Sequence, residues 1–253
     1  MSENIYADSA GVPWEGREFE PNAWADDDGK SNPRLLELIK ALHEGHARSE
    51  SVVDELRNTR VLIPLLADLG ESGVGPHGQT VDKSAELSIV TVETPDAQSG
   101  LPVFSSVEAM QRWNPKARPV PTAAVKAALA AAAEGNTRMI LDPMAESEFV
   151  LRRPAITALA QGLKWVSPEE DERVLTAFGK LLDNLEPLMG WELSAGDPLC
   201  LLASAEIELT LKLPEGLDHE TIDALLQKIA NSMAESFEIA EYVDSIRVKL
   251  AAA

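Results

Sequence analysis

Short apolar runs with the character of strands alternate with amphipathic helical segments along most of this chain. Leu35, Leu38 and Leu42 follow the polar and proline start "SNP" at spacings of three and four, which places them on one helical face. The run "RVLIPLLADL", which begins at Arg60, is instead typical of a buried strand. This alternation restricts the fold more than any other feature, because alternating helices and strands pack as layers around a sheet.

The alternation predicts an α/β (α+β) fold in which helices flank a mixed β-sheet. Further strands are expected in "ELSIVTVET", "LPVFSS", "TRMILDP" and "EFVLRR", and further helices in "SVEAMQRWN", "AAVKAALAAAAEG" and "PAITALAQG". From residue 168 the pattern restarts with a helix, the strands "PLCLLA" and "EIELTLKL", a helix over 219–243 and a closing strand "DSIRVKLA". We therefore predict an extended acidic arm over residues 1–30, a main domain over 31–165 and a small C-terminal ββαβ-like unit over 168–253.

Several helix ends carry capping signals. Ser105 stands three residues before Glu108, which is the spacing of a capping box. Thr122 is the expected N-cap of the alanine-rich helix and Gly135 its expected C-terminal stop, while Ser167 is available to cap the helix that follows. The prolines of "PKARPVP" favour an irregular connector, because a proline disfavours helix in the residue before it.

The formal net charge of −20 excludes two classes of partner. A chain this acidic repels nucleic-acid phosphates and anionic membrane headgroups, so we expect binding to neither. Residues 1–100 carry a net charge of −11 and residues 165–253 a net charge of −12, whereas residues 101–164 carry +3. This positive block either neutralises acidic neighbours within the fold or forms a surface for an acidic partner or an anion.

The only cysteine, Cys200, lies in the apolar run "PLCLLA" and cannot form an internal disulfide, which favours a reducing compartment. We expect its side chain to be a small apolar core group. The N-terminal 20 residues lack the basic and apolar regions of a signal peptide, and no apolar run approaches the roughly 18 residues of a membrane span. The predicted location is therefore the cytoplasm.

Three motifs point to chemistry that their context does not support. "GVGPHG" over 73–78 matches a dinucleotide-binding pattern, but a strand rather than a helix follows it, and Pro76 lacks an amide hydrogen for a phosphate. "HEGH" over 43–46 is one residue short of a zinc helix and has no further ligands at suitable spacing. Ser105 and Ser106 lie in no G-x-S-x-G segment and have no nearby histidine in the sequence. We predict no catalytic residue, metal or cofactor.

Four residues are candidates for binding a protein partner. Trp14 and Arg17 lie in the polar arm and are residue types that dominate binding hot spots. Trp14 either anchors the arm on its own domain or contacts a second molecule. Arg112 and Arg118, in the positive block, complete this predicted partner-binding set.

A second interpretation places a small-molecule site, or an enzyme's active site, at the ends of strands. Asp82, Lys83 and Ser105 are its candidate ligand-binding residues, with Arg118 converging on them. It predicts a concave pocket there with perturbed pKa values.

The segments "RVLIPLLAD", "LPVFSS" before a short helix, and "ILDP" resemble the N-terminal domain of the SseB (enhanced serine sensitivity protein B) family across residues 30–165. The details "DKS", "ARPVP" and "AGVPWEGR" are similar to an actinobacterial-like branch of that family. The resemblance implies a mixed α/β sheet domain without established catalytic residues. It also implies a link to serine sensitivity and to modulation of a rhodanese-type sulfurtransferase. We therefore expect a non-enzymatic interaction or regulatory module with a protein partner.

Overall fold

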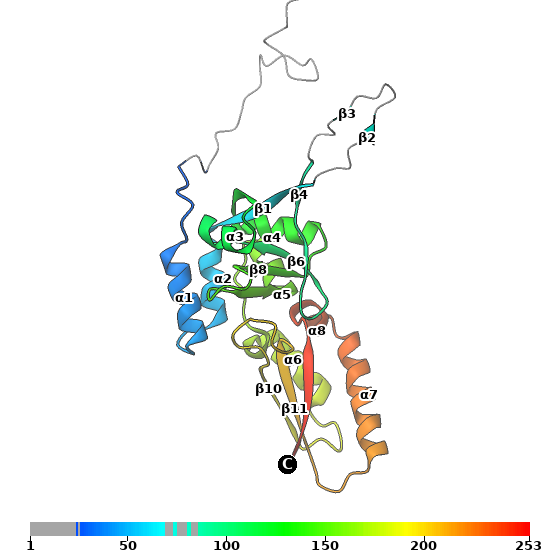
Figure 1. Ribbon diagram of the computed structural model, residues 1–253. Coiled ribbons are helices and arrows are strands. Elements are labelled where there is room, and N and C mark those ends of the chain that lie inside the picture. Colours follow the sequence, from blue (N-terminus) through cyan, green and yellow to red (C-terminus); the bar gives the residue numbers. More distant parts are fainter. Residues whose placement is uncertain (1–23, 25, 69–72, 75–79, 82–85) are drawn as a thin grey trace, which may run out of the picture.

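The computed structural model describes residues 24, 26–68, 73–74, 80–81 and 86–253, and Figure 1 shows its elements. The helices are α1 (Pro33–His43), α2 (Ser49–Leu56), α3 (Val107–Trp113), α4 (Ala124–Ala133), α5 (Arg153–Ala160), the 3₁₀ turn η1 (Pro168–Glu170), α6 (Glu172–Leu182), α7 (His219–Glu235) and α8 (Phe237–Tyr242). The strands are β1 (Arg60–Asp68), β2 (Gly73–Val74), β3 (Thr80–Val81), β4 (Glu86–Ile89), β5 (Val92–Glu93), β6 (Ser99–Val103), β7 (Arg118–Ala123), β8 (Arg138–Leu141), β9 (Phe149–Arg152), β10 (Gly190–Ala195), β11 (Ile207–Leu213) and β12 (Ile246–Ala252).

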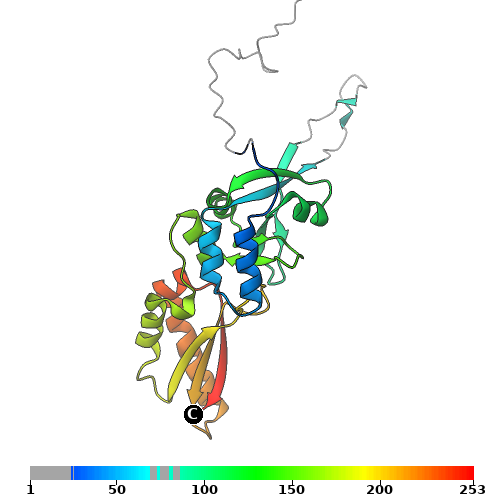
Figure 2. The ribbon, with the colours of Figure 1, turned by 90° about the vertical axis from the view of Figure 1, so that its left-hand side faces the viewer.

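The first part of the chain builds two sheets around one core. One sheet has the order β4-β1-β7 and is antiparallel, while the other has the order β5-β6-β8-β9 with β6 and β8 parallel. A bridge between Leu62 and Phe104 joins β1 to the end of β6. Buried residues of α1, α2, α4 and α5 pack with β1, β6, β8 and β9 in a single apolar cluster. Figure 2 shows α1 and α2 side by side on one face of this unit. The predicted mixed α/β fold is confirmed.

A smaller cluster forms around the other side of β1. Leu62, Phe104, Met110 and Ala117 are buried there, and the Trp113 ring lies 5.3 Å from that of Phe104. The apolar side of α3 therefore serves to pack this short helix onto β1.

The C-terminal part forms its own three-stranded sheet with the order β10-β11-β12. β10 and β11 are antiparallel, β11 and β12 are parallel, and α7 and α8 connect the last two strands. Ile207, Leu209, Leu211 and Leu213 of β11 are all buried against a second apolar cluster that includes α6, α7 and α8. None of the helices in the described ranges combines the length and apolar character needed to cross a bilayer.

The prediction of a strand in "PLCLLA" is wrong, and β10 was not predicted. Residues 198–204 form turns and bends, with φ of 54° at Cys200 and 57° at Leu202. The carboxylate of Asp197 explains this geometry, because it accepts hydrogen bonds from the backbone N–H groups of residues 201–203. These amides are then unavailable to a strand ladder.

Three capping predictions are also wrong. Ser106 rather than Ser105 is the N-cap of α3, because the Ser106 hydroxyl accepts from the Ala109 N–H at 3.1 Å. Thr122 does not cap α4, since it pairs with Val61 in the β-sheet. Asp171 takes the place of Ser167 as the side-chain cap of α6. Gly135, with φ of 74°, ends α4 as predicted.

The predicted connector "PKARPVP" is in part the strand β7. β7 pairs with β1 on one side and forms the edge of its sheet. An edge strand tolerates prolines such as Pro119 and Pro121, because a nitrogen on the open side need not donate a hydrogen bond.

Buried arginines of the first unit meet acidic groups of the C-terminal unit. Arg138 on β8 donates to both carboxylate oxygens of Asp244 at 2.8 Å, and Arg152 on β9 donates to Asp197 at 2.7 Å. Arg153 donates to backbone oxygens at the end of α8, including that of Ala240 at 2.6 Å. Three basic residues of the positive block 101–164 therefore neutralise partial or full negative charge within the fold.

Candidate functional site

A groove of about 980 Å³ lies between α1, α3 and the loop over residues 143–147. Leu36 and Ile39 contribute its apolar wall from α1, and Trp113 contributes from α3. The loop contributes Met144, whose side chain is 88% exposed. The groove is thus an open surface with a mixed polar and apolar lining and one protruding apolar side chain.

Two segments that are far apart in sequence meet beside this groove. Asp142 is 1% exposed, and its carboxylate accepts from the Ser105 N–H at 2.7 Å and from the Ser105 hydroxyl at 2.6 Å. The Ser147 hydroxyl donates to the same carboxylate at 2.7 Å, and the Ser31 and Ser105 hydroxyls lie 2.9 Å apart. These hydrogen bonds stabilise a buried charge that has no ion pair within the described part of the chain.

The loop that carries Met144 is held in an unusual conformation. Asp142 and Met144 have φ of 47° and 66°, in the left-handed region that disfavours side chains. The Met144 N–H donates to the Glu148 carboxylate at 2.6 Å, and the Ala145 N–H donates to the Asp142 carbonyl at 3.1 Å. Strain of this kind persists where surrounding contacts determine the conformation, and it clusters at functional sites. Met144 is therefore an exposed apolar group on a well-fixed support.

The groove does not have the geometry of a serine nucleophile. In a catalytic triad a histidine lies between the serine and the acid, whereas the Ser105 hydroxyl donates directly to Asp142. His43 lines the same groove, but its Nε2 atom is buried and has no hydrogen-bond partner within the described residues.

The structure brings together only part of the predicted site. Ser105 and Arg112 line the groove, and Arg112 forms an exposed ion pair with Glu108 one helical turn earlier. Arg118 is exposed at the start of β7, opposite Leu65, and does not line the groove.

The remaining predicted residues lie outside the described ranges. These are Trp14 and Arg17 of the arm, and Asp82 and Lys83 of the alternative ligand site. Their roles stay predictions, and so does a pocket at Asp82, Lys83 and Arg118.

Asp142 and Met144 were not singled out from the sequence. The "ILDP" segment contributed only to the family resemblance, although a carboxylate directly after a buried strand was the one available signal. Within the described ranges, no three histidine, cysteine or acidic side chains are grouped so as to hold a metal ion. His46 of the "HEGH" motif is exposed, 3.7 Å from Glu44.

Comparison with known proteins gives one finding. No curated protein and no solved structure matches the chain. Residues 35–158 match the family model described as the SseB protein N-terminal domain, and this range contains Ser105, Asp142 and Met144. The resemblance of "LPVFSS" and "ILDP" to that family is thereby confirmed, and residues 35–158 of the chain are an SseB N-terminal domain.

Proposed function

We propose that this protein acts by binding a protein partner rather than by catalysis, and that the groove beside Met144 is the contact surface. The observation that carries the proposal is the 88% exposure of Met144 on a loop fixed by Asp142, Ser147 and Glu148. Burying a methionine side chain contributes about 1.5–3 kcal/mol. Because the loop is already ordered, little of that free energy is lost in fixing it upon binding.

The lining of the groove indicates the chemistry of the partner. Lys40 and Arg112 are close to acidic residues of their own helices, Glu44 and Glu108, so the groove has no strong excess of either charge. An apolar anchor placed against Met144 fits this lining better than an acidic segment.

A rhodanese-type sulfurtransferase is the first partner to try, and this choice rests on the family resemblance alone. In that case the protein is a regulatory subunit that modulates the enzyme. The cytoplasm is its proposed location, a choice supported by the free thiol of Cys200.

The test is affinity capture with a matched pair of variants. Met144→Asp places a charge in the groove, whereas Met189→Asp makes the same change at another exposed methionine, on the C-terminal unit. We expect Met144→Asp to lose a partner that the wild type and Met189→Asp both retain. Retention of every partner by Met144→Asp, with an unchanged circular dichroism spectrum, contradicts the proposal.

The N-terminal arm is tested separately. If the arm contributes to binding, Trp14→Ala and Arg17→Glu are expected to weaken the binding of the same partner. If both variants bind like the wild type, the arm is not part of the contact surface, and the groove hypothesis is unaffected.

A further inference from the structure

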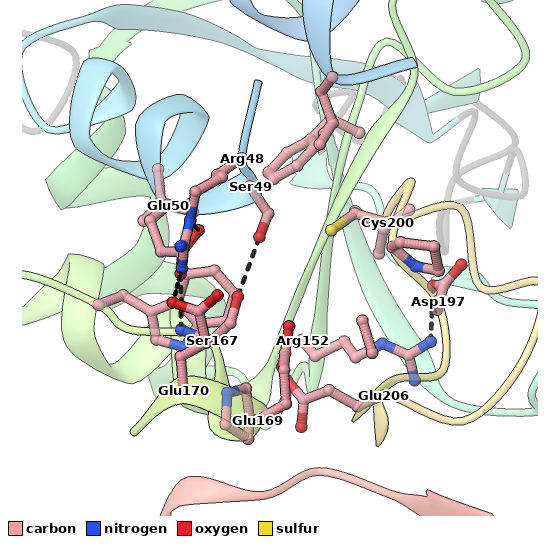
Figure 3. Close-up of a pocket in the computed structure, with 18 of the residues that line it drawn as sticks. Arg48, Ser49, Glu50, Arg152, Ser167, Glu169, Glu170, Asp197, Cys200 and Glu206 are labelled. Atoms are coloured by element: carbon pink, nitrogen blue, oxygen red, sulfur yellow. Dashed lines mark hydrogen bonds and ion pairs between the residues drawn. The ribbon is translucent and has the colours of Figure 1, made fainter. Parts of the chain in front are cut away.

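A second cavity, of about 180 Å³, lies between the first unit and the C-terminal unit (Figure 3). Its walls come from the start of α2, from β9, from η1, from the loop after β10 and from the residue before β11. It is therefore a feature of the junction, and neither unit forms it alone.

The arginines in this cavity are already neutralised. Arg48 pairs with Glu50 at 2.6 Å and also with Glu170. Arg152 pairs with Asp197 at 2.7 Å and donates to the Ser204 carbonyl at 2.6 Å. Both guanidinium groups already have acidic partners, so neither is free to bind an anion in the cavity.

Two carboxylates in the same cavity have no cationic partner. Within the described ranges, Glu169 and Glu206 form no ion pair with any lysine or arginine. Glu206 is 9% exposed, and one of its oxygens accepts the Asp244 N–H at 2.6 Å. Glu169 and Glu206, both labelled in Figure 3, line the cavity, and the negative charge of Glu169 contributes to raising the pKa of Glu206. A buried carboxylate without a counter-charge is unfavourable, so these two groups favour a cation in the cavity.

Part of the lining is apolar. Phe149, Val53, Cys200 and the ring of Trp165 contribute to it. The volume corresponds to about six water molecules at about 30 Å³ each. A group of that size with a charged end and an aliphatic end matches both the acidic and the apolar parts of the lining.

We propose that this junction cavity binds a small organic cation, a primary ammonium compound with a short apolar chain. The ammonium group lies between the Glu169 and Glu206 carboxylates, and the chain lies against Phe149 and Trp165. A metal ion is the weaker match, because the described residues here form no group of three metal-ligating side chains. The inference is independent of the proposed function, since the groove at Met144 shares no residue with this cavity.

Affinity for the cation is expected to rise with pH. Burial, with the nearby negative charge of Asp244, raises the pKa of Glu206 to about 7, and Arg152 on β9 only partly offsets this. Glu169 on η1 also has a raised pKa, mainly from burial, and Asp197 faces the cavity from the loop after β10. An ammonium ion binds the ionised carboxylates, so below neutral pH it must displace a proton.

The test is calorimetric titration of the full chain with n-butylammonium, using 1-butanol as the uncharged probe of the same shape. We expect n-butylammonium to bind and 1-butanol not to bind. The affinity for n-butylammonium is expected to be about tenfold higher at pH 8 than at pH 6. Glu169→Gln is expected to reduce the affinity at least about tenfold, whereas Glu215→Gln, an exposed glutamate elsewhere, leaves it unchanged.

Glu206→Gln removes the deeper carboxylate. If the Glu206→Gln variant fails to fold, the Glu169→Gln variant still tests the proposal. Equal binding of the two probes overturns the proposal, as does the absence of binding by both. Equal affinity of Glu169→Gln and Glu215→Gln for n-butylammonium also overturns it. None of these results bears on partner capture through Met144, so the two proposals fail separately.

Discussion

Arg138 on β8 and Arg152 on β9 stand directly opposite each other in their antiparallel pair, and both donate to the same carboxylate, that of Asp244. Like charges at facing positions destabilise a sheet. Here Asp244, from the segment before β12, supplies a shared compensating charge at 2.8 Å from Arg138 and 3.4 Å from Arg152. Each arginine has one further carboxylate at 2.7 Å, Asp96 for Arg138 and Asp197 for Arg152. Arg138, Arg152 and Asp244 are each at most 7% exposed. The C-terminal unit is thus part of what stabilises the sheet of the first unit.

Asp244→Ala is expected to lower the free energy of unfolding by about 1.5–3 kcal/mol, because it removes charge-assisted hydrogen bonds from two buried, facing guanidinium groups that keep only Asp96 and Asp197 as acidic partners. Urea denaturation followed by circular dichroism measures this. Arg34→Ala, which removes an exposed ion pair with Glu37, serves as the control and should change little. Similar stabilities for the two variants would show that the junction does not depend on Asp244.

Glu206→Gln is expected to change the pH dependence of stability. The pKa of Glu206 is raised to about 7, so ionisation in the folded state is unfavourable. As pH rises from about 4.5 to about 7, the wild type therefore loses about 3 kcal/mol of stability relative to the variant. Above about pH 7 no further loss is expected. Denaturation of both proteins at pH 5 and pH 8 measures the difference. A difference that does not change with pH would mean that Glu206 ionises normally in the fold.

Ser105→Ala and Ser106→Ala are expected to destabilise the protein for different reasons. Ser105→Ala removes a hydroxyl donor from the buried Asp142 carboxylate, with a loss of about 1–3 kcal/mol. Ser106→Ala removes the N-cap of α3, with a loss of about 1 kcal/mol. Thermal or urea denaturation of the two variants compares them. A larger effect at Ser106 would indicate that the Asp142 network contributes little.

Cys200 is expected to react slowly with alkylating reagents in the native protein. Burial raises the pKa of its thiol to about 12, so very little thiolate is present at pH 8. Iodoacetamide labelling at pH 8, followed by mass spectrometry, should be much faster in denaturant than in buffer. Equal rates in the two conditions would show that the junction cavity opens freely.

Much of the fold could be predicted from periodicity, because apolar spacing depends on local geometry. The helix at 33–43, the strand that begins at Arg60 and the closing strand of the C-terminal unit follow directly from it. Prediction failed where a side chain competes for backbone amides, as Asp197 does in "PLCLLA". It also failed for β7, whose prolines are compatible with a strand only because that strand lies at a sheet edge.

The candidate site was less predictable, because it depends on contacts between distant segments. Ser105 and Arg112 were singled out by residue type, but the acceptor that fixes Ser105, Asp142, lies 37 residues later. The charge distribution left two roles open for the positive block, neutralisation within the fold or a surface for a partner. Arg138 and Arg152, buried against Asp197 and Asp244, have the first role. Glu169 and Glu206 gave no sequence signal, since only the junction brings them together.

Site-specific photocrosslinking tests the central claim, that the groove beside Met144 contacts a protein partner. A benzoyl-phenylalanine crosslinker is placed at position 144, and at position 189 as the matched exposed control. We expect one discrete crosslinked partner from position 144 and none of that species from position 189. No crosslink from position 144, or the same crosslinked species from both positions, would contradict the assignment of the groove as the partner-binding surface.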